Sequence, residues 1–136
     1  MEITLNRLND AVHFEATNQD GLTMQLDGSP EIGGVNGGVS PMQAVLMSMA
    51  GCSAIDVVTL LKKMRQPLED IQIKVKADRV DDVPAVFSAI HIHYILTGDL
   101  DRDKAEKAVT LSVEKYCSVS KMLEKAATIS HSWELT

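Results

Sequence analysis

Hydrophobic and polar residues partly alternate in three short stretches near the N-terminus, a pattern typical of half-buried strands. The stretches are "ITLNRL", "AVHFEAT" and "LTMQLD", separated by Asn-Asp and Asp-Gly turn signals. A glycine-rich segment, "GSPEIGGVNGG", follows them. Its glycines match neither the dinucleotide-binding nor the Walker spacing, so we expect no nucleotide site there. The pattern predicts strands in residues 1–27 and a loop in residues 28–39.

The chain then carries no charged residue from Ser40 to Ile55. Ser40 and Pro41 are typical of the N-cap and first position of a helix, which we expect over residues 40–65. The run falls short of the ~20 apolar residues that span a membrane, so we expect a buried helix and no membrane contact. A helix that is apolar on every face must be covered on every face. The other predicted elements cover only part of it, so the sequence predicts a twofold dimer.

Alternation returns in "IQIKVKADRV" and "VFSAIHIHYIL", which predict two further strands. We expect Asp101 to cap a helix that ends near Tyr116, and "SVSKMLEKA" to restart a short helix capped by Ser118 or Ser120. The predicted segments are strands at 70–97, helices at 101–126 and a final strand at 127–135. The order βββ–α–ββ–αα–β favours a single α+β domain, residues 1–136, with mostly antiparallel sheet.

Composition narrows the class of protein. The formal net charge of −6 argues against a nucleic-acid or anionic lipid surface. The N-terminal sequence "MEITLNRLND" lacks the basic start and apolar stretch of a signal peptide, so we expect a cytoplasmic protein. Thiols stay reduced in the cytoplasm, so Cys52 and Cys117 do not predict a structural disulfide.

The two cysteines each allow a packing role and a chemical role. A free cysteine is commonly buried as a small hydrophobe, and Asp56, one helical turn after Cys52, would oppose a thiolate. A reactive Cys52 would need a cation from elsewhere in the fold. Cys117 precedes a helix start, whose N–H groups favour a thiolate, but taken alone a cysteine at a helix–helix joint is more often simply buried.

His91 and His93 lie two apart on a predicted strand and therefore share a face. Two such histidines could bind zinc, but the sequence shows no third ligand, so we predict no metal site. We expect these side chains to be solvated or hydrogen-bonded.

Three segments resemble one known family over nearly the whole chain. They are "SPMQAVLMSMAGCSAIDVV", the adjoining "LLKKMRQPLEDIQIKVKADRVDDVPAVFSAIHIHYILTG", and "SVEKYCSVSKML". They resemble the OsmC/Ohr family of osmotically inducible protein C and organic hydroperoxide resistance protein, most closely its YhfA-like branch. The resemblance implies antiparallel sheets that wrap two long central helices in an intertwined homodimer.

The resemblance also implies a thiol peroxidase of oxidative stress defence. Cys52 would be the peroxidatic thiol, which attacks an organic hydroperoxide and becomes a sulfenic acid. Cys117 would condense with it to a disulfide, and an external dithiol reductant would restore both thiols. No cofactor is implied.

The chain departs from the family at the activating pair. Peroxidase members hold an arginine near the thiolate with a glutamate ten residues before the reactive cysteine. Here that position is Met42, its neighbour is Gln43, and the sole arginine before the central helix is Arg7, our candidate activating cation. The alternative function is a non-enzymatic binding protein that holds a small hydrophobic ligand in an apolar, methionine-rich dimer crevice.

Overall fold

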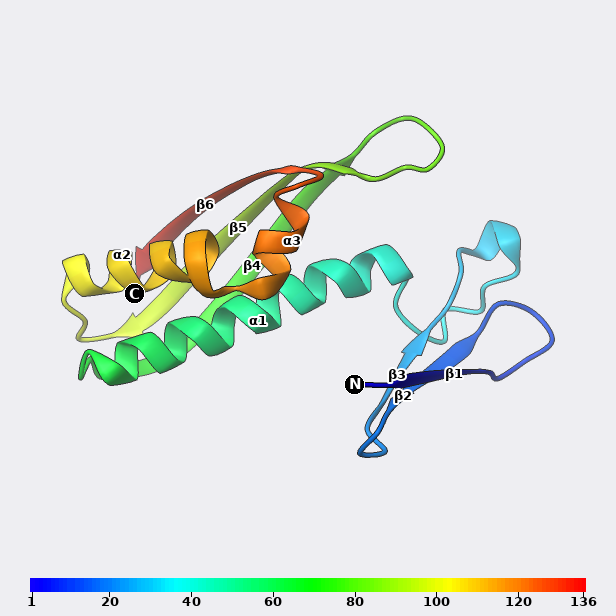
Figure 1. The fold of residues 1–136 in the computed structure, drawn as a ribbon, viewed down its shortest axis with the longest axis horizontal. Helices are drawn as coiled ribbons and strands as arrows, with labels where there is room; N and C mark the ends of the chain where they lie inside the picture. The colour runs from blue at the N-terminus through cyan, green and yellow to red at the C-terminus, as the bar shows by residue number, and fades with distance from the viewer. The chain divides into compact units, whose positions relative to one another are not determined.

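The computed structural model describes all of residues 1–136, drawn as a ribbon in Figure 1. The chain forms two compact units, Met1–Met47 and Ser48–Thr136. Each unit contains a three-stranded sheet, and helices complete the fold. The predicted α+β class is therefore confirmed.

The first unit contains an antiparallel sheet in the order β1-β2-β3. Its strands are β1 (Ile3–Arg7), β2 (Phe14–Asn18) and β3 (Thr23–Leu26). Arg7 is the last residue of β1 and is exposed. Several large apolar side chains of this unit are exposed as well: Ile3 (61%), Leu5 (53%), Leu22 (71%) and Met24 (44%). A sheet with such a surface is typical of one that packs against a partner.

Asp27, directly after β3, organises the glycine-rich loop. Its side chain is 3% exposed and accepts three backbone hydrogen bonds, from Gly28 at 2.8 Å and from Val35 and Gly37 at 3.0 Å each. These N–H groups, above all that of Gly37, lower the pKa of the Asp27 carboxyl. The loop, which contains the short 3₁₀ helix η1 (Pro30–Ile32), is thus held by hydrogen bonds to one buried carboxylate.

Helix α1 (Pro41–Lys63) begins with a reciprocal pair of hydrogen bonds. Ser40 Oγ accepts from the backbone N–H of Gln43 at 3.2 Å, and Gln43 Oε1 accepts from the N–H of Ser40 at 3.1 Å. The predicted Ser40 N-cap is confirmed, and Gln43 completes a capping box. Gln43 therefore has a structural role at the start of α1.

Only one face of α1 is buried within the chain. Met49, Ser53, Val57 and Leu61, spaced four residues apart, are fully buried at 0% exposure. On other faces Met47 is 52% exposed, Ile55 68% and Val58 42%.

Helix α1 is the one helix that is long and apolar enough to cross a membrane. The core helix of a soluble protein meets the same criteria of length and composition.

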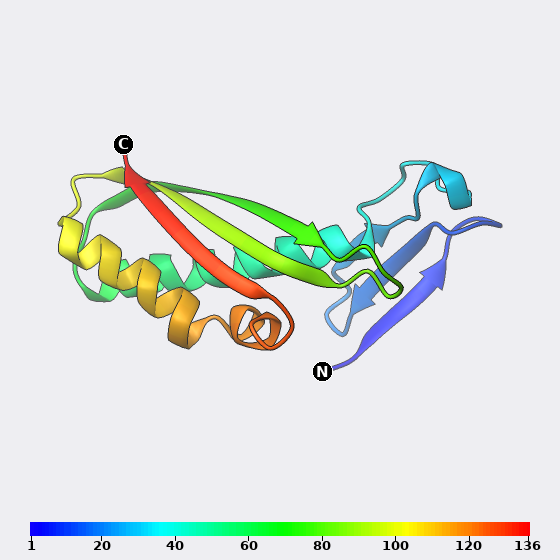
Figure 2. The same cartoon turned by 90° about the horizontal axis from the view of Figure 1, so that it is seen from above.

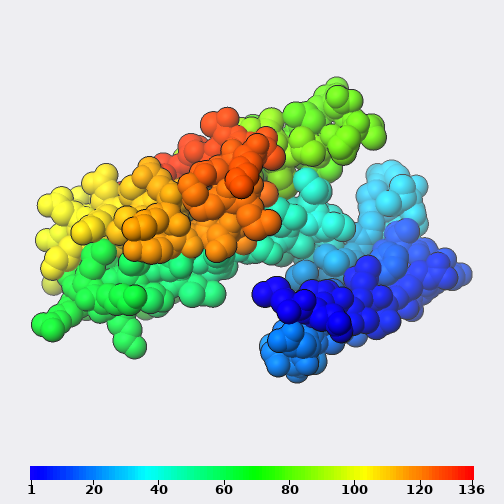
Figure 3. Space-filling model, in the orientation of Figure 1, coloured from blue at the N-terminus to red at the C-terminus, as the bar shows by residue number.

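The second unit packs α1 and the helices that follow β5 on one face of a sheet with the order β4-β5-β6 (Figures 1 and 2). The strands are β4 (Leu68–Arg79), β5 (Phe87–Gly98) and β6 (Thr128–Leu135). After β5 come α2 (Arg102–Leu111), the π-helix η2 (Ser112–Tyr116) and α3 (Ser118–Leu123). Alternate residues of β5 are buried toward these helices: Ile90, Ile92, Tyr94 and Leu96. Figure 3 shows the side chains of residues 102–123, yellow to orange, lying directly against those of α1.

Two details correct the sequence analysis. Strands β5 and β6 pair in parallel, whereas the other pairs are antiparallel. The chain between them crosses the sheet through α2 and α3, and such a crossover returns a strand in the same direction. The N-cap of α3 is Cys117, in place of the predicted Ser118 or Ser120. The Asp101 cap of α2 is confirmed, because its side chain accepts from the N–H of Lys104 at 3.0 Å.

Candidate functional site: two thiols and a carboxylate

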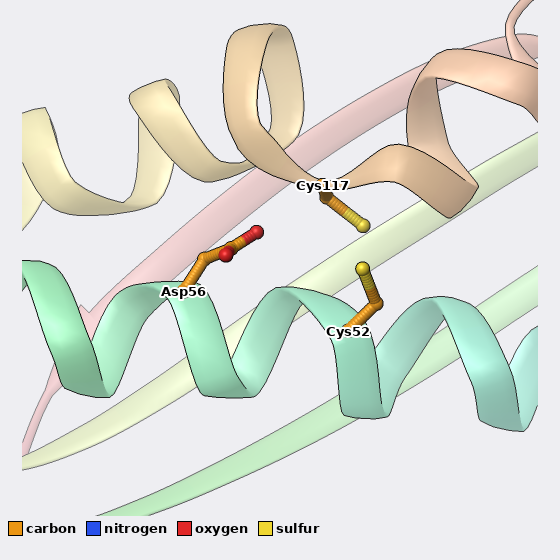
Figure 4. A group of neighbouring side chains, drawn as sticks. All are labelled: Cys52, Asp56 and Cys117. Atoms are coloured by element: carbon orange, nitrogen blue, oxygen red, sulfur yellow. The ribbon is translucent and has the colours of Figure 1, made fainter.

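The fold brings Cys52, from the middle of α1, next to Cys117, at the start of α3. Both are free thiols, and their sulfur atoms point toward each other in Figure 4. Asp56, one turn after Cys52 on α1, directs its carboxylate toward the same place. One ligand-type atom from each of these residues lies within 4.8 Å of the other two. We call this group the thiol–carboxylate cluster.

Cys117 is held firmly by backbone groups. It is 0% exposed, its thiol donates to the carbonyl oxygen of Met49 at 3.9 Å, and its Sγ accepts from the N–H of Ser120 at 3.4 Å. The first contact ties the start of α3 to α1 one turn before Cys52. The second is the cap of α3. The local geometry therefore fixes the sulfur beside that of Cys52.

Burial controls the acidity of Cys117. Removal from water raises the pKa of its thiol, and the neighbouring Cys52 raises it further. Hydrogen bonding from Ser120 opposes this increase and is outweighed. The sequence argument was right that a helix N–H group contacts this sulfur. The burial that the alternative interpretation expected is also present, and it raises the pKa of the Cys117 thiol despite this contact.

Asp56 is partly buried in an environment that suits a neutral carboxyl. Its Oδ2 atom is buried and has no hydrogen-bond partner. Burial raises the pKa of Asp56, and hydrogen bonding by the Ser112 side chain opposes the increase only in part. A carboxylate in such a place is a stronger base than an ordinary aspartate, since its charged form is less well solvated.

A chain of buried hydroxyl groups joins α1, β5 and η2. Ser53 Oγ makes hydrogen bonds with Tyr94 Oη and, at 2.7 Å, with Ser112 Oγ. Ser112 Oγ also donates to the carbonyl oxygen of Ser53 at 3.2 Å. Burial raises the pKa of Tyr94 to about 12, so the phenol stays protonated. Sequence analysis missed these three residues, because a single hydroxyl side chain leaves no periodic signal.

A surface pocket of about 250 Å³ opens beside Asp56. Its lining comes from α1 and η2: Asp56, Thr59, Leu60, Lys63 and Tyr116. Asp56 therefore belongs both to the lining of this pocket and to the thiol–carboxylate cluster.

The other candidate residues lie elsewhere. His91 bonds the hydroxyls of Ser130 and Ser132, and His93 bonds Ser132 and lies 3.6 Å from Glu134. The hydrogen-bonded state expected for these histidines is confirmed. The thiol–carboxylate cluster, by contrast, gathers two sulfur atoms and a carboxylate oxygen, atom types that can bind a metal ion. Arg7 belongs to the first unit.

Comparison with known proteins agrees with this fold. The profile of the OsmC-like protein family matches residues 34–132. Protein YhfA of Escherichia coli strain K12 is 50% identical over 97 residues, which cover 71% of this chain and 72% of YhfA. The chain therefore belongs to the OsmC-like family.

Solved structures show the same architecture. A hypothetical protein from Aquifex aeolicus VF5 is 34% identical with a TM-score of 0.85, over 99% of this chain and 95% of that one. The organic hydroperoxide resistance protein OhrB of Bacillus subtilis is 22% identical with a TM-score of 0.65, over 98% of this chain and 96% of OhrB. The fold is thus shared with proteins named for organic hydroperoxide resistance.

Proposed function

We propose that the protein reduces organic hydroperoxides through a cycle of Cys52 and Cys117. The observation that carries the proposal is the arrangement of the two free sulfur atoms, which face each other within 4.8 Å. A disulfide requires a sulfur separation of about 2.05 Å, so the two sulfur atoms would move closer together to form one. Membership in the OsmC-like family supports the same chemistry.

The exposure of the two thiols supports the order of events. Cys52 is partly exposed, whereas Cys117 is fully buried. Cys52 would attack the outer peroxide oxygen as a thiolate, the O–O bond would break, and the alkoxide would leave as an alcohol after taking a proton. Cys117 would then attack the sulfur of the Cys52 sulfenic acid, releasing water and forming the disulfide. An external dithiol would reduce that disulfide, and no cofactor takes part.

The test is consumption of cumene hydroperoxide with dithiothreitol as the reductant. We expect wild type to turn over and Cys52→Ser to be inactive. Cys117→Ser should keep a sulfenic acid on Cys52, which dimedone traps. Ser118→Ala, at an exposed position beside Cys117, is the control for local disturbance and should match wild type. Unchanged turnover in Cys52→Ser would refute the assignment.

Arg7 remains our candidate for the cation that activates Cys52. The cluster itself consists of three acidic groups, so a thiolate there would gain from an added positive charge. Arg7→Ala should slow alkylation of Cys52 by iodoacetamide at neutral pH, measured with Cys117 replaced by serine. Arg102→Ala, on α2, is the matched control. Equal rates in both variants would exclude Arg7.

We also propose a homodimer that works in the cytoplasm, without nucleic acid or membrane. Support comes from apolar side chains left exposed on the first sheet and on α1, such as Leu22 at 71% and Ile55 at 68%. Sedimentation at low micromolar concentration should give one species near twice the 14.8 kDa chain mass. A folded monomer under these conditions would contradict the proposed dimer.

The alternative, a binding protein for a small hydrophobic ligand, predicts different results. The same exposed apolar side chains support it, since a dimer could enclose a crevice between them. Native mass spectrometry of the purified protein would then show a bound small molecule. A double Cys52→Ser, Cys117→Ser variant would retain that ligand, and wild type would not consume hydroperoxide.

A further inference from the structure

The buried Cys117 thiol must lose a proton before it can attack Cys52, and the structure restricts where that proton can go. Cys117 is 0% exposed, so water does not reach it directly. Its thiol points to the carbonyl oxygen of Met49, which is not a base. The basic atom that lies within 4.8 Å of both sulfurs is a carboxylate oxygen of Asp56.

Asp56 is also placed to exchange that proton with solvent. Oδ2 is buried and has no hydrogen-bond partner, so it is free to accept one. The same residue lines the open pocket formed with Thr59, Leu60, Lys63 and Tyr116. The same side chain therefore lies near both thiols and lines a pocket that opens to solvent.

We propose that Asp56 is the acid–base residue of the thiol cycle. The peroxide step of this proposal rests on the hydroperoxide reduction proposed above. In the first step Asp56 takes the proton of Cys52, whose thiolate attacks the hydroperoxide, and returns it to the departing alkoxide. In the second step it takes the proton of Cys117, whose thiolate attacks the Cys52 sulfenic acid. The S–O bond breaks, and the departing hydroxide takes the proton from Asp56 and leaves as water.

The surroundings of Asp56 suit this role. The titratable groups around it are Cys52 on α1, Cys117 before α3, Tyr94 on β5, and Lys63 and Tyr116 at the pocket. Tyr94 stays protonated because of its burial, so it does not compete as a base. Burial raises the pKa of Asp56 and hydrogen bonding by the Ser112 side chain offsets this only in part, so the carboxylate is a stronger base than an ordinary aspartate. Acid–base catalysis of this kind typically contributes about 10²–10⁴-fold.

The decisive variant is Asp56→Asn, which keeps the size of the side chain and removes the base. After one equivalent of cumene hydroperoxide, we expect disulfide formation at pH 7 to slow by roughly 10²-fold, within the range of general acid–base catalysis. Its rate should rise steadily with pH as hydroxide replaces the carboxylate. Asp56→Glu should restore part of the rate, and Asp103→Asn, at an exposed position on α2, should behave as wild type. Wild-type rate and pH profile in Asp56→Asn would overturn the proposal.

A second arm separates this proposal from the peroxidase function. 5,5′-Dithiobis(2-nitrobenzoate) forms a mixed disulfide with Cys52 and releases one coloured thiolate, and attack by Cys117 on that disulfide releases another. Asp56→Asn should slow the second release and leave its amplitude unchanged, even if wild type consumes no hydroperoxide. Ser112→Ala should move the pH profile of this release to higher pH, because it removes the bond that lowers the pKa of Asp56. Equal second-phase rates in wild type and Asp56→Asn would contradict the acid–base role, whatever the peroxide result.

Discussion

The buried hydroxyl chain Tyr94–Ser53–Ser112 yields a quantitative prediction about stability. Ser53 and Ser112 are 0% exposed, as is Tyr94, so a hydroxyl that loses its partner there cannot turn to water. Ser53→Ala leaves the Tyr94 hydroxyl without its Ser53 bond, at a cost of about 1–3 kcal/mol for an unsatisfied buried group. In this variant Ser112 Oγ can still donate to the backbone carbonyl oxygen of residue 53, which lies 3.2 Å away in the wild-type protein.

Tyr94→Phe removes the same bond from the other end and should cost less. Ser53 Oγ retains Ser112 as a partner, so the loss is that of one net hydrogen bond, about 0.5–1.5 kcal/mol. The double variant Ser53→Ala with Tyr94→Phe has no hydroxyl group at position 94, so none is left there without a partner. We therefore expect Ser53→Ala with Tyr94→Phe to cost clearly less than the sum of the two single variants.

Urea denaturation at a fixed protein concentration, followed by circular dichroism, measures these differences. With a slope of about 2 kcal/mol/M, Ser53→Ala should lower the urea midpoint by roughly 1 M. Thr59→Ala, an exposed hydroxyl on the same helix, is the matched control and should change the midpoint little. Costs that simply add, or a larger cost for Tyr94→Phe than for Ser53→Ala, would refute this account of the network.

Three further predictions concern charge and packing. The lowered pKa of Asp27 means that its carboxylate stabilises the fold at pH values above the ordinary pKa of 3.8. This contribution disappears as the pH falls through the lower pKa of the folded state. Asp27→Asn should therefore be less stable than wild type at pH 7 by urea denaturation, and it should lose less stability than wild type in acid. Burial raises the pKa of Asp56, so its charged form lowers the stability of the fold at high pH. Asp56→Asn should therefore be more stable than wild type at pH 8 and equal to it below pH ~4. A more stable wild type at pH 8 would contradict burial as the cause of the raised pKa. Leu61→Ala, at a fully buried position, should cost about 2–5 kcal/mol, whereas the exposed Lys62→Ala should change stability by less than ~0.5 kcal/mol.

Local signals allowed much of the fold to be predicted. Ser40 and Asp101 were identifiable as helix caps because a short polar side chain just before a helix accepts hydrogen bonds from its free N–H groups. The parallel pairing of β5 with β6 was missed, although a connection through two helices is the signal that could have indicated it. The predicted N-cap of α3, Ser118 or Ser120, was wrong because the cap is the sulfur atom of Cys117, whereas helix N-caps are more often hydroxyl groups.

The candidate site depends on tertiary contacts that periodicity does not encode. Cys52 and Cys117 are 65 positions apart, and only the resemblance to a family linked them before the structure was known. Asp56 was visible in the sequence as a charge that would oppose a thiolate. Its burial, its unpartnered oxygen and its closeness to both sulfurs change that interpretation, and they arise from packing between α1 and η2.

The most direct test of the thiol cycle is to identify the bond that the protein forms under oxidation. Reduced wild type should be treated with one equivalent of cumene hydroperoxide, alkylated, digested and analysed by mass spectrometry. We predict a peptide pair joined through Cys52 and Cys117, with the loss of two hydrogen atoms in the intact mass and one alcohol formed per chain. Two alkylated cysteines and unconsumed hydroperoxide would contradict the central claim.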